Sequence, residues 1–278
     1  MNSNRTPTIG VFDSGFGGLT VLRALIQRLP QARFAFLGDT ARLPYGSKSR
    51  RTIARYAAQS AQFLVQEQGA EFLIIACNTA SALALDAIQD AVPVPVLGVI
   101  EPGATAARAA SRTGDVLVIA TDATVQSHAY AAACRAHGLR ALEKACPLLV
   151  PLVEEGWTDH PVTEQVIRIY LDELNAEAAA AGLNPDTLVL GCTHYPLLRP
   201  LIEAAVPSGI RVIDSAESTA ETAQRQFGES FALSAAGLDI VEPEIHCFAS
   251  DSVEKFERLG SRFLDRAVGK VKLVDLGG

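Results

Sequence analysis

Residues 187–202 read TLVLGCTHYPLLRPLI, and this stretch decides how the chain folds. An apolar, strand-like run ends at Gly191, a short polar segment follows, and leucine and isoleucine then recur at helical spacing. Residues 72–88, FLIIACNTASALALDAI, repeat this order with a second cysteine at the same point. Strands that alternate with helices predict mostly parallel sheets covered on both faces, so the expected fold class is α/β.

The alternation of strand and helix extends over the rest of the chain. It restarts near residue 115, which indicates two similar α/β lobes with a first boundary near residues 98–104. Periodicity leaves open whether the C-terminal part extends the second lobe or returns to the first. Further strands are expected at residues 8–12, 33–38, 94–100, 115–121, 210–214, 244–250 and 270–276. Helices are expected at about 19–29, 50–68, 82–92, 124–138, 162–181 and 197–206.

The composition narrows the class of protein. With 278 residues, 49% hydrophobic and 20% charged, the chain is expected to be globular and soluble. It has neither a signal-peptide pattern at the start nor an apolar run long enough to cross a membrane. Five widely spaced cysteines without a CxxC pair argue against disulfides and zinc and fit the cytoplasm. The net charge of −7 with no basic run predicts no nucleic-acid partner.

Cys77 and Cys192 each follow the carboxyl end of a predicted strand, where open parallel sheets bind ligands. Either cysteine alone would be read as a buried packing residue, but their equivalent positions in two lobes indicate a shared function. The following helices should present free N–H groups and lower each thiol pKa. A disulfide would join the thiols and a metal would need more ligands. Two opposed thiols suit inversion of a stereocentre, since one removes a proton from one face and the other supplies one to the opposite face.

The loop VFDSGFGG at residues 11–18 allows three interpretations. A dinucleotide fingerprint fits poorly, because Thr20 replaces its third glycine and Asp13 would repel a pyrophosphate. Asp13 and Ser14 are better suited to an ammonium group and a proton relay. The remaining alternative is an aspartate that only caps the helix.

Other polar and charged residues divide into site candidates and structural residues. Pro44, Tyr45 and Gly46 predict either a turn with its amides toward a ligand or an ordinary surface loop. His194 lies two residues after Cys192 and is a candidate general acid or thiolate stabiliser. The other residues are expected to be structural. Packing is expected for Cys134, Cys146 and Cys247, and a solvated surface for Asp115, Glu154 and Glu155.

At this point several long motifs resemble the cofactor-independent aspartate/glutamate racemase superfamily, and within it the bacterial glutamate racemases. Phe16 departs from the valine of many relatives, at a position that should not affect the chemistry. The motifs cover most of the chain in the expected order, and the last 50 or so residues contain none. They are GVFDSGFGGLTVL (10–22), LGDTARLPYG (37–46), IIACNTAS (74–81), VIEPG (99–103), CPLLVPLVEEG (146–156), LVLGCTHYPLL (188–198) and IDSAES (213–218).

The resemblance implies interconversion of L-glutamate and D-glutamate for peptidoglycan synthesis, with no cofactor and no metal. It implies two α/β lobes, residues 1–98 with 214–278 and residues 99–213, with the active site in the cleft between them. Cys77 would deprotonate D-glutamate with help from Asp13, and Cys192 would deprotonate L-glutamate with help from His194. The implied substrate-binding residues are Asp13, Ser14, Pro44, Tyr45, Gly46, Asn78, Thr79, Thr121, Thr193 and His194.

Rival functions differ from this one at specific positions. Aspartate racemases usually carry glutamate where this chain has His194, and related decarboxylases use only one of the two cysteines. A pyridoxal-phosphate enzyme would need a Schiff-base lysine, for which no candidate follows an apolar strand. A nonenzymatic amino-acid-binding protein remains the alternative from another class. The chain starts without the N-terminal extension of precursor-activated relatives, so we expect no such activation. Many relatives dimerise, so a homodimer is compatible with the resemblance.

Overall fold

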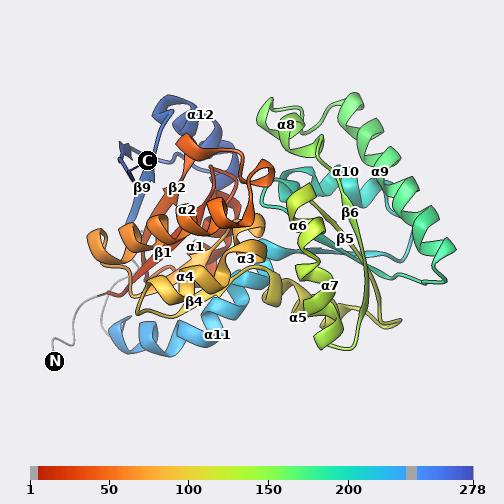
Figure 1. Ribbon diagram of the computed structural model, residues 1–278, viewed down its shortest axis with the longest axis horizontal. Helices are drawn as coiled ribbons and strands as arrows, with labels where there is room; N and C mark the ends of the chain where they lie inside the picture. Colours follow the sequence, from red (N-terminus) through yellow and green to blue (C-terminus); the bar gives the residue numbers. More distant parts are fainter. Residues whose placement is uncertain (1–5, 236–242, 278) are drawn as a thin grey trace.

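The computed structural model describes residues 6–235 and 243–277, in which helices surround two sheets (Figure 1). The strand order is β10-β9-β2-β1-β3-β4 in the first sheet and β6-β5-β7-β8 in the second. Every strand pair within these residues is parallel, which confirms the predicted α/β class. The strands are β1 (Thr8–Asp13), β2 (Arg33–Gly38), β3 (Phe72–Ile75), β4 (Val96–Gly98), β5 (Asp115–Ala120), β6 (Arg140–Ala145), β7 (Thr187–Gly191), β8 (Arg211–Asp214), β9 (Ile245–Ala249) and β10 (Val271–Leu273).

Helices connect the strands and cover the sheets. None of those within the described ranges is long and apolar enough to cross a membrane. The α-helices are α1 (Leu19–Arg28), α2 (Arg50–Gln62), α3 (Asn78–Leu83), α4 (Leu85–Ala91), α5 (Ile100–Ala110), α6 (Asp122–Ser127), α7 (Ala129–Ala136), α8 (Leu149–Glu154), α9 (Pro161–Ala180), α10 (Arg199–Ala205), α11 (Ser215–Ala235) and α12 (Val253–Leu264). Short 3₁₀ turns are η1 (Thr40–Arg42), η2 (Tyr45–Ser47) and η4 (Tyr195–Leu198), and η3 (Phe63–Glu67) is a π-helical turn.

Alternate residues of β1 point to opposite faces of the first sheet, as the two-residue repeat of a strand requires. Ile9 and Val11 join a large core cluster with α1, whereas Phe12 joins a smaller cluster with α2. Helix α1 packs against α11 and α12, and α2 packs against α4. Strands β9 and β10, near the end of the chain, extend the first sheet beside β2. The proposed domain limits at residues 98 and 213 stay a prediction.

The sequence pattern missed helices α5 and α8 and strand β6, and a physical reason is evident for α5 and β6. Helix α5 begins where a lobe boundary was expected, and its IEPGATAARAA sequence has too few large apolar residues to show a period. Pro102 is tolerated there because it lies in the first turn, where backbone N–H groups have no partner inside the helix. Strand β6 is an edge strand without fully buried residues, so it lacks an apolar run. The short helix α8 was also not expected.

Two predicted helices are interrupted in the structure. The one expected over 82–92 starts earlier, at Asn78, and breaks at Ala84, where φ is −139°. The one expected over 124–138 breaks at His128, whose φ of 54° is left-handed. The earlier start of α3 matters for function, because it makes Cys77 the N-cap residue.

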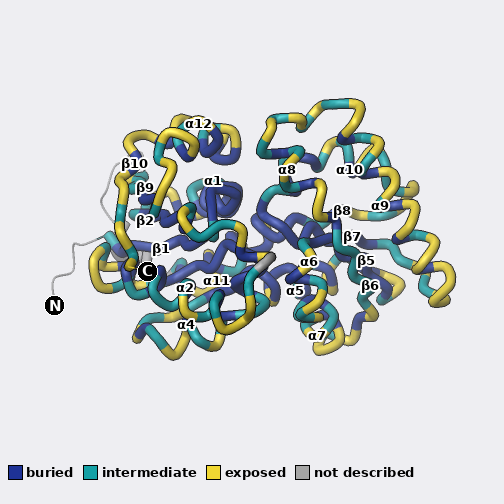
Figure 2. Tube along the Cα trace, turned by 45° about the horizontal axis from the view of Figure 1, so that its top comes forward, coloured by how far each residue is buried: buried dark blue, intermediate teal, exposed yellow. Residues whose placement is uncertain are grey.

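The larger core cluster contains buried side chains from both sheets. It includes Val11 and Ile74 of the first sheet together with Val118 and Leu190 of the second. Figure 2 shows buried chain in the interior of both halves of the molecule. The two sheets therefore share this larger cluster, whereas the smaller cluster lies on the α2 face of the first sheet.

Asp115 is not a solvated surface residue, so that expectation was wrong. Its side chain is buried at the start of β5 and accepts two hydrogen bonds of 2.7 Å from Arg140. A third, from the backbone N–H of Asn184, is also 2.7 Å long. Burial opposes ionisation, but these hydrogen bonds and the charge of Arg140 hold the pKa of Asp115 below its usual value. The carboxylate thus ties β5 to β6 and to the segment before β7.

Substitution of Asp115 by alanine is expected to lower the free energy of unfolding by about 2 kcal/mol at neutral pH. Because folding lowers the pKa of this carboxyl group, its stabilisation is present above the ordinary pKa and is lost as pH falls. Urea unfolding of both proteins at several pH values would measure this. Asp172→Ala, at an exposed position of α9, is the control and should change little. An equal difference at acid and neutral pH would contradict an electrostatic origin.

Candidate active site

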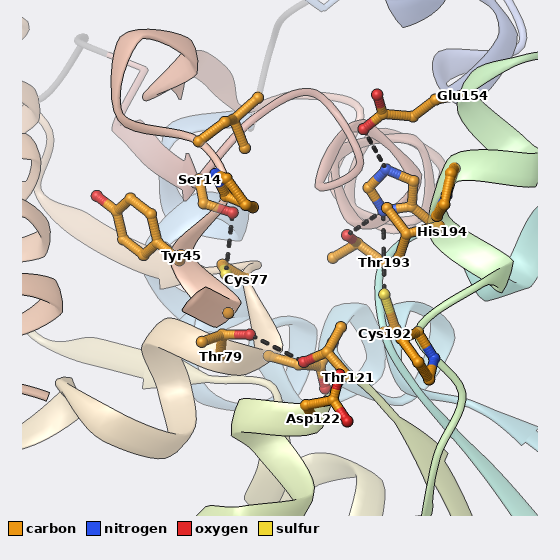
Figure 3. Close-up of a pocket in the computed structure, with 17 residues that line it drawn as sticks. Ser14, Tyr45, Cys77, Thr79, Thr121, Asp122, Glu154, Cys192, Thr193 and His194 are labelled. Carbon is orange, nitrogen blue, oxygen red and sulfur yellow. Dashed lines mark hydrogen bonds and ion pairs between the residues drawn. The ribbon is translucent and has the colours of Figure 1, made fainter. Parts of the chain in front are cut away.

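A pocket of about 360 Å³ lies between the carboxyl ends of the two sheets (Figure 3). Its size is typical of small-molecule sites. The sequence-predicted site residues line it with one exception, Asp13. Those that line it are Ser14, Pro44, Tyr45, Gly46, Cys77, Asn78, Thr79, Thr121, Cys192, Thr193 and His194. Residues far apart in the sequence are brought together because parallel strands direct their carboxyl ends to the same edge of each sheet.

Cys77 caps the N-terminus of α3. Its sulfur accepts the backbone N–H of Ala80 at 3.4 Å and lies 3.3 Å from Ser14 Oγ. Burial and then the negative charge of Asp13 raise the pKa of Cys77 to about 12, although the hydrogen bonds act in the opposite direction. The expectation of a lowered pKa at this helix N-terminus was therefore wrong for Cys77, because burial outweighs the short helix. At neutral pH this sulfur carries its proton.

Asp13 lies behind the pocket instead of lining it. Its Oδ2 accepts the backbone N–H of Gly15 at 2.9 Å, and Oδ1 has no hydrogen-bond partner among the described residues. Burial raises the pKa of Asp13, while the hydrogen bond from Gly15 and the charge of His194 lower it. Asp13 thus interacts electrostatically with the Cys77 side and with His194 without facing the cavity. Its direct contact with a ligand stays a prediction.

On the other side of the pocket, Cys192, His194 and Glu154 form a line of interacting groups, visible in Figure 3. Cys192 Sγ lies 4.0 Å from His194 Nδ1, and His194 Nε2 lies 3.4 Å from Glu154 Oε1. The second contact has the distance of an ion pair but not the geometry of a hydrogen bond. Burial alone would lower the pKa of His194, but its contacts with Cys192 and Glu154 and their charges raise it to about 10. His194 is therefore a cation at neutral pH, placed to stabilise negative charge on the Cys192 sulfur.

Sequence analysis missed Glu154, which was expected on the solvated surface. Its carboxylate also contacts Lys255 Nζ at 3.2 Å, and α8 directs it to the pocket wall. A glutamate at the end of a short helix has no local pattern that separates it from a surface residue. The available signal was its place in the motif at residues 146–156. Asp122, at the start of α6, also lines the pocket and was not predicted.

Hydrogen bonds between the two lobes hold the polar edges of the pocket. Thr79 Oγ1 lies 3.2 Å from Thr121 Oγ1, joining the segment after β3 to the segment after β5. Thr20 donates its hydroxyl to the carbonyl of Thr193 at 3.1 Å, across the interface to the Cys192 turn. A side chain at Gly17 could not fit, because its Cβ would lie 2.4 Å from Thr193 Oγ1. The lobes therefore meet tightly beside the Cys192 turn.

The predicted loop at residues 44–46 forms another wall. The peptide bond between Leu43 and Pro44 is cis, and Tyr45 donates its hydroxyl to Asp39 Oδ2 at 2.6 Å. Figure 3 shows this hydroxyl pointing away from the cavity. Tyr45 thus offers its ring and backbone to the pocket, not its hydroxyl.

The remaining cysteines are buried, as expected for packing residues. Within residues 6–235 and 243–277, no three or more His, Cys, Asp or Glu side chains are grouped as metal ligands would be. The pocket instead combines a protonated thiol, a second sulfur beside an imidazolium, and several hydroxyl and amide groups. This arrangement can accept a proton on one side of a bound molecule and donate one on the other.

Comparisons with known proteins agree with this chemistry. A model of the Asp/Glu/Hydantoin racemase family matches residues 9–223. The chain is 52% identical over 294 residues to a glutamate racemase of Koribacter versatilis, covering 99% of this chain and 100% of the relative. It is 46% identical over 275 residues to a glutamate racemase of Geobacter metallireducens, covering 96% of each. The solved glutamate racemase of Francisella tularensis in complex with D-glutamate matches with a TM-score of 0.86 and 35% identity, covering 99% of this chain and 98% of that one.

Proposed function

The chain belongs to the Asp/Glu/Hydantoin racemase family, and from this we propose that it interconverts L-glutamate and D-glutamate with two thiols and no cofactor. The product D-glutamate serves peptidoglycan synthesis, the known purpose of this activity in the family. The observation that carries the proposal is the position of Cys77 and Cys192 on opposite sides of one pocket (Figure 3). Inversion requires a separate group on each face of the α-carbon, and the pocket supplies one cysteine to each.

In the direction from L-glutamate to D-glutamate, the sulfur of Cys192 removes the α-proton as a thiolate. The imidazolium of His194, held by Glu154, stabilises that thiolate before the proton moves. Cys77 then donates its thiol proton to the opposite face, and its raised pKa means that this proton is in place at neutral pH. The reverse reaction exchanges these roles, with Asp13 near Cys77 as the assisting group.

The α-proton of an amino acid is very weakly acidic, so the pocket must stabilise the charge that develops when it leaves. Ser14, Asn78, Thr79, Thr121 and Thr193 supply hydroxyl and amide groups for the α-amino and α-carboxylate groups. Pro44, Tyr45 and Gly46 form the wall assigned to the side-chain carboxylate. Apolar residues complete the lining and limit water near the reacting carbon. They include Leu43, Val150 and Pro151.

The test is incubation of the purified protein with L-glutamate alone in deuterated buffer. We expect the circular dichroism signal to decay to zero while deuterium appears at Cα in the NMR spectrum. Decay with L-aspartate but not with L-glutamate would indicate that the protein is an aspartate racemase. No change with either amino acid would favour the binding-protein alternative, which calorimetry with both amino acids would then examine.

We also propose a cellular compartment and an oligomeric state for the protein. The protein would act in the cytoplasm, which is consistent with five free and buried cysteines. Its ligands are then L-glutamate and D-glutamate, and the tendency of relatives to dimerise suggests a homodimer. Sedimentation equilibrium at micromolar concentration would determine the assembly state.

A further inference from the structure

A buried tyrosine of the second lobe contacts an amide of the first lobe in the pocket wall. Tyr130, in α7, is completely buried and donates its hydroxyl to Asn78 Oδ1 at 2.7 Å. We propose that Tyr130 is a positioning residue that fixes the Asn78 amide with its N–H group directed at a carboxylate of the bound substrate. This inference rests on the proposed function and adds a residue that does not itself line the pocket.

The direction of the hydrogen bonds determines which end of the amide is free. Burial raises the pKa of Tyr130 above its usual value, so the hydroxyl keeps its proton. The side chain of Ser215 also interacts with the Tyr130 hydroxyl and acts to lower that pKa, but burial outweighs it. The hydroxyl donates this proton to Asn78 Oδ1 at 2.7 Å, so the amide cannot present this oxygen to the cavity.

The other end of the amide has no partner in the part of the chain that the structure describes. Asn78 lines the pocket and is only 3% exposed, and its Nδ2 has no hydrogen-bond partner among the described residues. A buried N–H group without an acceptor is unfavourable. A substrate carboxylate is an acceptor of matching charge and completes the pair. Without Tyr130 the amide could rotate by half a turn and place its oxygen against that carboxylate.

The surroundings of Tyr130 link this amide to the arrangement of the lobes. A Cβ at Gly103 would lie 3.2 Å from the Tyr130 ring, and one at Gly191 would lie 2.9 Å from it. Gly103 lies in α5, which connects β4 of the first sheet to β5 of the second. Ser215 begins α11, which follows β8 of the second sheet. Tyr130 thus packs beside both connections between the sheets. The lobes must be correctly docked for the Asn78 amide to be oriented.

The experiment is a double-mutant cycle of Tyr130→Phe and Asn78→Ala, with kcat and KM measured in both directions. Tyr130→Phe should reduce kcat/KM for glutamate on the order of 10-fold, because an oriented hydrogen bond to a charged group is lost. In the Asn78→Ala background the same change should have no further effect, because Tyr130 acts through that amide. If the fold-changes of the two substitutions multiply in the double variant, the proposal is wrong. Full activity in Tyr130→Phe would also contradict it.

Two additional variants separate positioning from folding. Tyr170→Phe removes one tyrosine hydroxyl from the same lobe, away from Asn78, and should leave kcat/KM within about twofold. Ser215→Ala frees the Tyr130 hydroxyl to reorient, so it should lower kcat/KM in the same direction and lose its effect when Asn78 is alanine. If Tyr130→Phe does not fold, Ser215→Ala takes its place in the double-mutant cycle. The same two results then support or contradict the positioning role of Tyr130.

Binding measurements keep this inference distinct from the proposed function. Calorimetry with D-glutamate should show binding weakened on the order of 10-fold by Tyr130→Phe, and not further weakened when Asn78 is alanine. If the wild-type protein binds D-glutamate without racemising it, the proposed function fails while this cycle still tests Tyr130. Unchanged affinity in Tyr130→Phe would contradict the positioning role even in an active racemase.

Discussion

Replacement of Cys77 or of Cys192 by serine is expected to slow racemisation of glutamate by about 10²- to 10⁴-fold in both directions. A serine hydroxyl is far less acidic than a thiol, so it cannot act as the base near neutral pH. Each direction of the reaction needs both groups, because one removes the proton and the other returns one to the opposite face. Circular dichroism with each enantiomer as the starting material would measure the loss.

The two variants should nevertheless differ in proton exchange. Cys77→Ser retains Cys192 with His194, so L-glutamate should still exchange its α-proton for deuterium without inverting. Cys192→Ser should show the same one-sided exchange with D-glutamate. NMR of each enantiomer in deuterated buffer would detect this difference. The opposite pairing would reverse the assigned roles, and full racemisation by either variant would refute the two-base mechanism.

Cys247→Ser is a matched control for these substitutions. Cys247 is buried in β9 within the hydrophobic core and does not line the pocket. The change should lower stability slightly, because a hydroxyl group is buried. Turnover by the folded protein should remain within about twofold of the wild-type value.

Replacement of His194 by asparagine is expected to reduce racemisation about 10²-fold at neutral pH. The imidazolium would no longer stabilise the thiolate of Cys192, from which it lies 4.0 Å away. In the wild-type protein the pKa of His194 is raised to about 10, so its positive charge is lost only as pH rises through that value. The wild-type activity should accordingly decline at alkaline pH, and a pH–rate profile would show this limb.

Glu154→Gln provides a graded test of the same interaction. Removing this carboxylate takes away one of the groups that raise the pKa of His194, so the alkaline limb should move to lower pH by roughly one unit. Glu155→Gln changes the exposed neighbouring residue in the same way and should leave the profile in place. Reduced activity in Glu154→Gln with an unshifted alkaline limb would show that Glu154 does not act through His194.

The sequence predicted those parts of the fold in which side-chain periodicity is strong. Strands such as Phe72–Ile75 and Thr187–Gly191 are apolar and buried on both faces, so their pattern is unambiguous. Helix α5 was not predicted, because its small residues give no apolar periodicity. Strand β6 was not predicted, because it lies at an exposed edge and lacks an apolar run. Asp115 was misplaced because its partner Arg140 lies on a neighbouring strand, and pairing between strands has no local signature.

The site was predictable where its residues follow strand ends. Thr121 and Cys192 come directly after a buried strand and Cys77 comes two residues after one, so the sheet topology places all three at the pocket. Glu154 and Tyr130 could not be found in this way, because their positions depend on how helices of the second lobe pack. The pKa of Cys77 was also beyond sequence reasoning, since the degree of burial determines it.

The shared core that joins side chains of both sheets has a consequence for how the protein denatures. With apolar contacts continuous between the halves, neither half can melt without exposing surface that the other half covers. Heat should therefore produce one cooperative transition with equal calorimetric and van't Hoff enthalpies, although the chain contains two sheets. The pocket would then persist up to the melting temperature and disappear with the whole fold.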